Sequence, residues 1–135
     1  MKLLIDANIL LDVLQNREPH VQASSVVWKL CETEKAKGYV SALTFANLVN
    51  IMRKELDPKK IGEILEALSL IFELADFNAS DLTHASEMEW DDFEDAVQSV
   101  TAERVHADYI ITRNVRDFAK SKVVAFTPSE LIARI

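Results

Sequence analysis

Three aspartates of this chain stand where a metal-dependent hydrolase would need them. Asp6 closes the first apolar run, at residues 3–5. Asp95 precedes a helix-like stretch, and Asp117 follows the last strong β signal, at 109–112. In an open α/β sheet, ligands bind at the carboxyl ends of the strands. Carboxylates gathered at that edge would repel one another unless a hard divalent cation lay between them. The positions of these acids therefore predict a metal-dependent enzyme.

Each acid also has a purely structural explanation. Asp6 could be the N-cap of the helix that follows it. With Asp92 as an N-cap, Asp95 would occupy the third helical position, where an acid suits the helix dipole. Asp117 could be an ordinary loop residue. The joint placement favours the functional interpretation, because strand ends from distant segments would bring all three acids to one edge.

The composition indicates one globular domain. The chain has 135 residues, of which 49% are hydrophobic and 27% charged, and we expect a single domain over 1–135. No apolar run reaches the roughly 20 residues of a membrane span. Asp6 and Asp12 interrupt the apolar N-terminus, so no signal peptide is expected either. The single cysteine, Cys31, cannot form an internal disulfide, which favours a cytoplasmic location.

Charge is distributed unevenly along the chain. The net charge is −7, and twelve of the 22 acids lie in 61–103, where no Lys or Arg occurs. Bases cluster at 53–60 and again around Asp117, where Arg113 and Arg116 are candidates for phosphate contact. Solvated helix faces explain the first cluster equally well. An acidic pocket rimmed by bases suits an enzyme that engages a polyanion through a metal ion.

Hydrophobic periodicity predicts an alternation of strands and helices. Short apolar runs predict strands at 2–6, 39–41, 74–77, 109–112 and 123–126. Apolar residues three and four apart predict helices at 7–14, 20–37, 43–56, 61–72, 80–89 and 93–105. We expect Gly38 to mark the end of the second helix, Ser80 to cap the fifth, and Thr127 to cap a last one. Consecutive parallel strands need such crossovers. The expected fold class is therefore α/β, a three-layer α/β/α sandwich with a mostly parallel central sheet.

Other common chemistries lack their motifs. The histidines are far apart and none has the spacing of a zinc-ligand pair. No glycine-rich loop indicates nucleoside triphosphate binding, and no serine has convincing His and Asp companions. A phosphatase on a doubly wound sheet would have Asp-x-Asp after the first strand, where residues 6–8 read Asp-Ala-Asn.

Four segments, taken in order, resemble the PIN-domain nucleases. They are LLIDANILLDVL at 3–14, GYVSALTFANLVNIMRK at 38–54, DFEDAVQSVTA at 92–102 and DYIITRNVRDF at 108–118. The resemblance spans nearly the whole chain. It implies the PIN-like α/β sandwich and cleavage of RNA with Mg²⁺ or Mn²⁺. Many small members are VapC-like toxins of toxin–antitoxin pairs, so it also implies an antitoxin partner that lies over the cleft and a homodimer.

The resemblance extends to single residues, with two departures. Asp6 and Asp95 match the first acid and the helix-start acid of the family. Asn47 stands where the family usually has a Glu, and Asn114 where it usually has an Asp. Asp117, three residues further on, is expected to take over the role of that Asp. A branch of the family shows the same pattern, SALT-x-AN with TRN-x-x-DF.

This correspondence implies roles for the matched residues. The catalytic metal ligands would be Asp6, Asp95, Asp117 and Asp92. The residues that position water or phosphate would be Asn47, Asn114, Thr112, Arg113 and Arg116. An amide ligates a metal ion without contributing charge, so we expect weak metal binding in the free protein. The two amides also motivate an alternative, a catalytically weak or inactive RNA-binding or regulatory module on the same fold.

Overall fold

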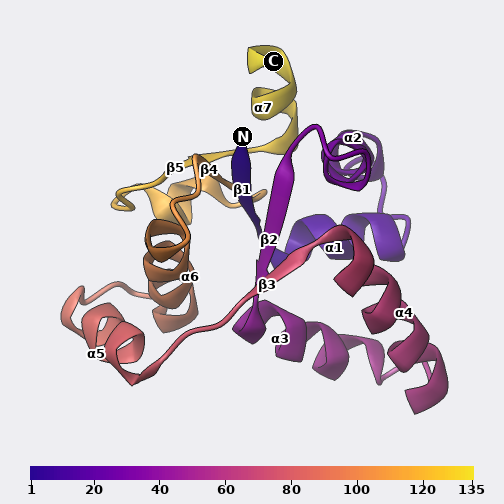
Figure 1. The fold of residues 1–135 in the computed structure, drawn as a ribbon, viewed down its shortest axis with the longest axis horizontal. Helices are drawn as coiled ribbons and strands as arrows, with labels where there is room; N and C mark the ends of the chain where they lie inside the picture. The colour runs from indigo at the N-terminus through magenta and orange to yellow at the C-terminus, as the bar shows by residue number, and fades with distance from the viewer.

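A single parallel sheet forms the centre of the protein, which a computed structural model describes over residues 1–135. The strand order is β3-β2-β1-β4-β5, and every neighbouring pair is parallel (Figure 1). The strands are β1 (Lys2–Ile5), β2 (Lys37–Ser41), β3 (Glu73–Ala75), β4 (Tyr109–Ile111) and β5 (Val124–Phe126). The predicted fold class is confirmed, with a sheet that is wholly rather than mostly parallel.

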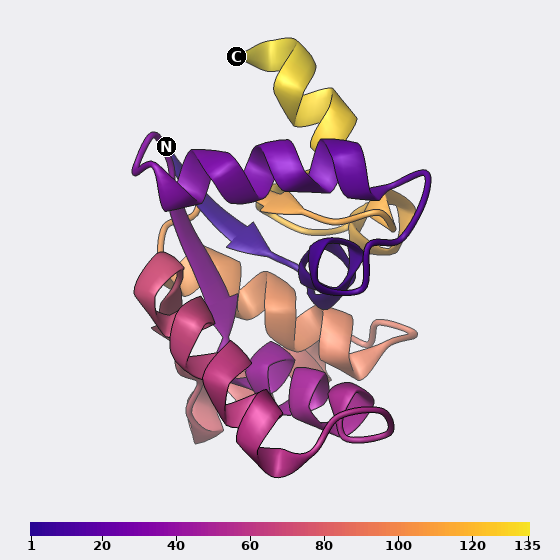
Figure 2. The same cartoon turned by 90° about the vertical axis from the view of Figure 1, so that its right-hand side faces the viewer.

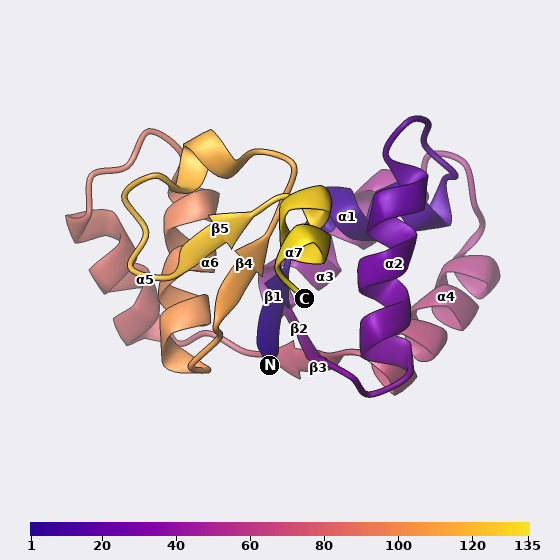
Figure 3. The same ribbon diagram turned by 90° about the horizontal axis from the view of Figure 1, so that it is seen from above.

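Helices cover both faces of this sheet. They are α1 (Ala7–Leu14), α2 (Val21–Glu32), α3 (Ala42–Met52), α4 (Pro58–Ile71), α5 (Ala79–Glu87), α6 (Phe93–Arg104) and α7 (Pro128–Arg134), with a 3₁₀ helix η1 (Val115–Phe118) after β4. Figure 2 shows α2 on one side of the strands and α6 on the other, and Figure 3 shows α5 beside α6. No helix is both long and apolar enough to cross a membrane.

The alternation of side chains along β1 explains why the sheet needs both helical layers. Leu3 and Ile5 lie in a core cluster with residues of α1 to α4 and α7, whereas Leu4 lies in a second cluster with Ala102 of α6. All three β1 side chains are at most 1% exposed. Successive strand residues point to opposite faces, so an all-apolar strand is stable only when both faces are covered.

Several helices begin at a side chain that accepts an amide hydrogen bond. Asp6 caps α1, and Thr127 forms a capping box with Glu130 at the start of α7, as the sequence predicts. The cap predicted at Ser80 is wrong. Asn78 caps α5 instead, since its side chain accepts from the Asp81 amide at 2.9 Å and Asp81 accepts in return from the Asn78 amide.

The second helix is shorter than its sequence pattern suggests. It ends at Glu32 rather than at 37, and Lys37 already belongs to β2. The Lys37 amide donates to the Met1 carbonyl at 2.9 Å, so pairing with β1 outweighs the local helical preference. Gly38 lies inside β2 and does not end the helix. A Cβ there would come within 2.7 Å of both Cys31 Sγ and the Phe72 ring. Likewise, α3 ends at Met52 rather than at 56.

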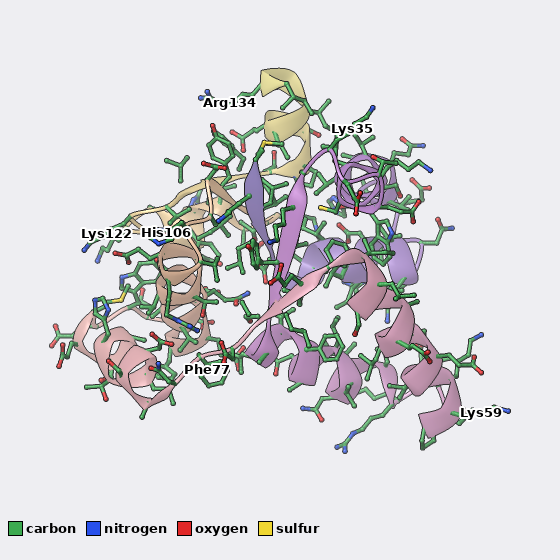
Figure 4. The ribbon with its side chains drawn as sticks, in the orientation of Figure 1. Lys35, Lys59, Phe77, His106, Lys122 and Arg134 are labelled. Atoms are coloured by element: carbon green, nitrogen blue, oxygen red, sulfur yellow. The ribbon has the colours of Figure 1, made fainter.

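Figure 4 shows the charged periphery of this fold. The labelled basic side chains Lys35, Lys59, Lys122 and Arg134 extend outward from the ribbon. Lys59 lies in the first turn of α4, next to Lys60, whose Nζ is 4.0 Å from Glu63. The bases of segment 53–60 that lie on α4 are therefore on a solvated helix face, which is one of the two interpretations of that segment.

Replacing Gly38 with Ala should destabilise the protein by about 1–3 kcal/mol, because the added methyl overpacks a buried contact. The neighbours, Cys31 and Phe72, are 4% and 5% exposed and have little room to move. Gly62→Ala is the matched control: its Cβ would meet nothing within 4 Å, and it lies inside α4. That change should stabilise by up to about 1 kcal/mol. Urea unfolding of both variants checks this, and equal stabilities would contradict it.

Candidate active site

The parallel pairing of β1 with β4 places their carboxyl ends side by side. Ile5 is paired with Ile111, and the Asp6 amide donates to the Ile111 carbonyl at 3.0 Å. Asp6 and Thr112 therefore follow adjacent strands at the point where the strand order reverses. This is the position at which open α/β sheets bind their ligands.

Asp6 is the most firmly held acid at this edge. Its Oδ1 accepts the Ala7 amide at 2.8 Å, and its Oδ2 accepts the Thr112 hydroxyl at 2.8 Å and the Asn8 amide group at 3.4 Å. Burial raises the pKa of Asp6 above its ordinary value, although the hydrogen bonds from Thr112 and Ala7 oppose that rise. The nearby charge of Asp117 raises it further.

A hollow of about 310 Å³ opens beside Asp6, between the start of α6 and η1. We call it the acidic hollow; its lining consists of Trp90, Asp91, Asp92, Asp95, Arg116, Asp117, Ala119 and Lys120. Asp92 is the N-cap of α6, and its Oδ1 accepts the Asp95 amide at 3.1 Å. Asp95 therefore occupies the third helical position, which confirms the capping interpretation, and both residues also line the acidic hollow.

The acidity of Asp95 is also strongly perturbed. Burial, followed by the charges of Asp92, Asp6, Asp117 and Glu94, raises the pKa of Asp95 to about 7. The four acids come from three separate segments of the chain. Their mutual effect means that the structure gathers them closely enough for their charges to interact.

The two asparagines singled out in the sequence, Asn47 and Asn114, take different positions. Asn47, on α3, donates to Glu94 Oε2 at 3.3 Å, so it lies beside the acidic start of α6. Asn114 is exposed; its backbone amide donates to Thr112 Oγ1 at 3.0 Å. The same hydroxyl donates to Asp6, so Thr112 links the loop after β4 to the buried acid.

Arg113 and Arg116 also differ. Arg116 lines the acidic hollow beside Asp117, where it can contact a phosphate. Arg113 turns away from this hollow: its Nε lies 3.2 Å from Oδ2 of Asp12, a fully buried acid that also accepts the Ser24 hydroxyl at 2.8 Å. The Arg113 N–H is not aligned with that oxygen, and Asp12 Oδ1 has no hydrogen-bond partner. Arg113 therefore lies outside the acidic hollow, and its predicted contact with a phosphate stays a prediction.

Gln98 is a residue of this site that sequence reasoning missed. It lies on α6 one turn after Asp95, is 5% exposed, and donates from Nε2 to Thr44 Oγ1 at 2.9 Å. A hydrogen bond from Gln98 lowers the pKa of Asp6, so its amide also lies close to that acid. Its Oε1 is buried without a partner. The spacing of three from Asp95 was the available signal, because residues three apart share a helix face.

This donor set suits a hard divalent cation. It consists of interacting carboxylates and one unpartnered buried amide oxygen, and oxygen donors are the ligands that Mg²⁺ and Mn²⁺ prefer. No three acidic, histidine or cysteine side chains are close enough to hold one ion together. An ion here would therefore keep several water ligands, as Mg²⁺ commonly does.

Replacing Asp95 with Asn should stabilise the metal-free protein above pH 7, by about 1 kcal/mol once solvent screening is allowed for. The pKa of Asp95, about 7 in the folded protein, exceeds the value of about 3.9 expected when unfolded. Between about pH 3.9 and pH 7, the folded state holds a proton on Asp95 that the unfolded state has lost. The free energy of unfolding therefore falls as the pH rises through this range. The variant and the original should be similar at pH 4 and diverge by pH 8.

Thermal unfolding in EDTA across this pH range measures the effect. Asp91→Asn is the matched control, because it removes one charge from the same hollow but Asp91 is not among the charges that raise the Asp95 pKa. If Asp91→Asn stabilised as much as Asp95→Asn, net charge rather than the burial of Asp95 would explain the result.

Comparison with known proteins places this site in a family. The family model described as "PIN domain" matches residues 2–116, which contain Asp6, Asp95, Thr112 and Arg116. Comparison with curated proteins gives no significant match.

Solved structures match over nearly the whole chain. VapBC-1 from nontypeable Haemophilus influenzae is 17% identical, covering 96% of this chain and 99% of that one, with a TM-score of 0.73. A toxin–antitoxin complex from Klebsiella pneumoniae is 22% identical, covering 93% and 96%, with a TM-score of 0.71. FitAcB from Neisseria gonorrhoeae is 22% identical, covering 94% and 98%, with a TM-score of 0.68. At these identities the structures show a shared fold. Together with the family model, which spans most of the chain, they lead to the conclusion that this protein belongs to the PIN-domain family.

Proposed function

We propose that this protein is a metal-dependent endoribonuclease and the toxin of a toxin–antitoxin pair. The observation that carries the proposal is the raised pKa of Asp95, which burial raises most and to which the charges of Asp92, Asp6 and Asp117 contribute. Acids gathered from separate segments at the ligand-binding edge of a PIN domain need a cation to neutralise them. Phosphodiester hydrolysis is a reaction that such a site supports.

The proposed direct metal ligands are Asp6 and Asp95, with Asp117 acting through a bound water, Asp92 in reserve and Gln98 Oε1 as a neutral oxygen donor. When bound, Mg²⁺ or Mn²⁺ supplies Lewis acidity and positive charge at the reacting phosphate. Thr112 and the Ala7 amide fix the Asp6 carboxylate, which spares it reorganisation during the reaction.

The other side chains of the hollow orient the substrate. Arg116 and Lys120 line the acidic hollow and can hold the phosphate oxygens, while Asn47 and Asn114 position water or phosphate nearby. Attack of water on phosphorus then breaks the bond to the leaving ribose oxygen. No histidine lines the hollow, and this chemistry needs none.

The matched structures include a toxin–antitoxin complex and VapBC-1, and on this likeness we infer an antitoxin protein as a partner. We also infer a homodimer and action in the cytoplasm, where Cys31 stays reduced. On α4, Leu70 is 86% exposed, which leaves apolar surface for such contacts.

The purified protein should cleave single-stranded RNA with Mg²⁺ or Mn²⁺ and lose that activity in EDTA. Asp6→Ala should lower the rate by at least about a hundredfold, because it removes the best-fixed ligand of the ion. Cleavage of a mixed-sequence RNA, followed on denaturing gels, measures this.

Glu63→Ala is a matched control, since it removes one carboxylate that is exposed on α4, remote from the hollow. It should leave the rate unchanged. Cleavage that survived in Asp6→Ala, or that did not depend on metal, would contradict the proposed site.

A second candidate function is a catalytically weak RNA-binding or regulatory module. It is favoured by the two amides at positions where the family usually has acids, and by the absence of three acids close enough to share an ion. On this fold such a module would bind RNA without cleaving it.

Restoring the usual acids distinguishes the two candidates. Asn47→Glu and Asn114→Asp should each tighten Mg²⁺ binding, by about tenfold, because a carboxylate adds charge where an amide adds none. Calorimetric titration with MgCl₂ measures the affinity. Asn50→Glu adds the same charge one turn further along α3 and serves as the control. Unchanged affinity in both restored variants would favour the module.

A further inference from the structure

A second hollow, free of carboxylates, lies on the other side of the loop after β4. It has a volume of about 380 Å³, and we call it the basic hollow. Its polar lining comes from the first turn of α2 (His20), from that loop (Arg113, Asn114) and from the start of α7 (Thr127, Ser129). In a chain of net charge −7, a hollow that contains arginine and no acid is suited to an anion.

Arg113 lines this hollow and is paired with a buried acid behind it. Its inner nitrogen, Nε, is buried at 3.2 Å from Asp12, while the side chain as a whole is 28% exposed. Asp12 is fully buried and is also held by Ser24, so the guanidinium is fixed from behind. Two oxygens of a phosphate match the fork that an arginine presents.

The α2 helix contributes free backbone donors to the same hollow. The Val21 and Ser24 amides donate to the carbonyls of Arg17 and His20, but those of Gln22 and Ala23 have no acceptor. His20, the N-cap residue, makes no capping hydrogen bond with its side chain. Ala23 lines the hollow, so a residue with an unpaired amide and the arginine belong to the same lining.

The basic hollow and the acidic hollow are lined by neighbouring residues of one short segment. Asn114 lines the basic hollow, whereas Arg116 and Asp117 line the acidic hollow. The Asn114 amide also donates to Thr112, which holds Asp6. A polyanionic strand that crosses residues 112–117 would therefore occupy both hollows.

We propose that the basic hollow binds a backbone phosphate of single-stranded RNA, one neighbouring the phosphate that is cleaved. The inference rests on the proposed nuclease function and names the path of its substrate. The lining offers an arginine and a backbone amide, which bind phosphate oxygens, and its only aromatic ring is that of His20. The contact is thus made to the backbone and is independent of sequence.

Ala23→Glu tests this proposal without disturbing the helix. Residue 23 is the third position of α2, where an acid interacts favourably with the helix dipole. The new carboxylate would occupy the anion site and repel phosphate. Val26→Glu adds the same charge on α2 at a residue that is 43% exposed and outside the hollow.

Binding of a fluorescein-labelled oligouridylate is measured by anisotropy in EDTA, where no cleavage occurs. Ala23→Glu should weaken binding by about tenfold and make it less dependent on salt, whereas Val26→Glu should change it less than about twofold. In the unsubstituted protein, RNA should also shift the NMR signals of the Gln22 and Ala23 amides.

A double variant, Asp12→Asn with Arg113→Gln, gives a second test. It removes both charges of the buried pair, so no unpaired charge is left in the interior, and it should also weaken binding by about tenfold. Equal affinities of all variants, or no RNA binding by the unsubstituted protein, would overturn the proposal. If the variants bind RNA as expected but the unsubstituted protein does not cleave RNA in Mg²⁺, the binding site stands and the nuclease function is rejected.

Discussion

Repulsion among Asp6, Asp92, Asp95 and Asp117 is the constraint around which one edge of this protein is arranged. The all-parallel sheet creates the constraint, because pairing of β1 with β4 brings the ends of remote segments together. Local hydrogen bonds make the arrangement tolerable: Thr112 and the Ala7 amide hold Asp6, and the Asp95 amide donates to Asp92. They do not remove the repulsion, which adds to the effect of burial in raising the pKa of Asp95 to about 7. Carboxyl groups whose pKa is raised by burial and by neighbouring charges are typical of functional sites.

The amides at this edge reduce the repulsion among the carboxylates. Asn47 donates to Glu94, one of the charges that raise the Asp95 pKa, and so satisfies an acid instead of adding one. Gln98 does the same for Asp6 and leaves one buried oxygen without a partner. A site with fewer charges folds more easily without an ion but attracts the ion less strongly. Under the proposed function, the substrate phosphate would then supply part of the negative charge that holds the ion.

Much of this could be predicted from the sequence, for identifiable reasons. The fold class followed from strands alternating with helices, and the caps at Asp6, Asp92 and Thr127 followed from local side-chain chemistry. Tertiary contacts decided what local patterns could not. Pairing of Lys37 with β1 shortened α2, and close packing rather than a helix end explains Gly38. The pairing of Arg113 with Asp12, a buried acid on α1, could not be predicted, because the neighbours of Arg113 in sequence do not reveal it. The functional roles of the acids stay predictions.

Two hollows of different charge resolve a difficulty that the overall charge creates. A chain of net charge −7 repels RNA at long range, and its acidic hollow repels a phosphate most strongly when no ion is present. Under the proposed function, the basic hollow provides attraction that does not depend on the ion, and the loop of residues 112–117 separates the two. Binding at Arg113 would then hold a neighbouring phosphate, and with it the strand, over Asp6 and Asp117. Proximity of this kind raises the effective concentration of the scissile phosphate at the acids. Under the proposed function, the two sites therefore act together. The acidic site holds the ion but repels RNA, and the separate anion site attracts RNA but holds no ion.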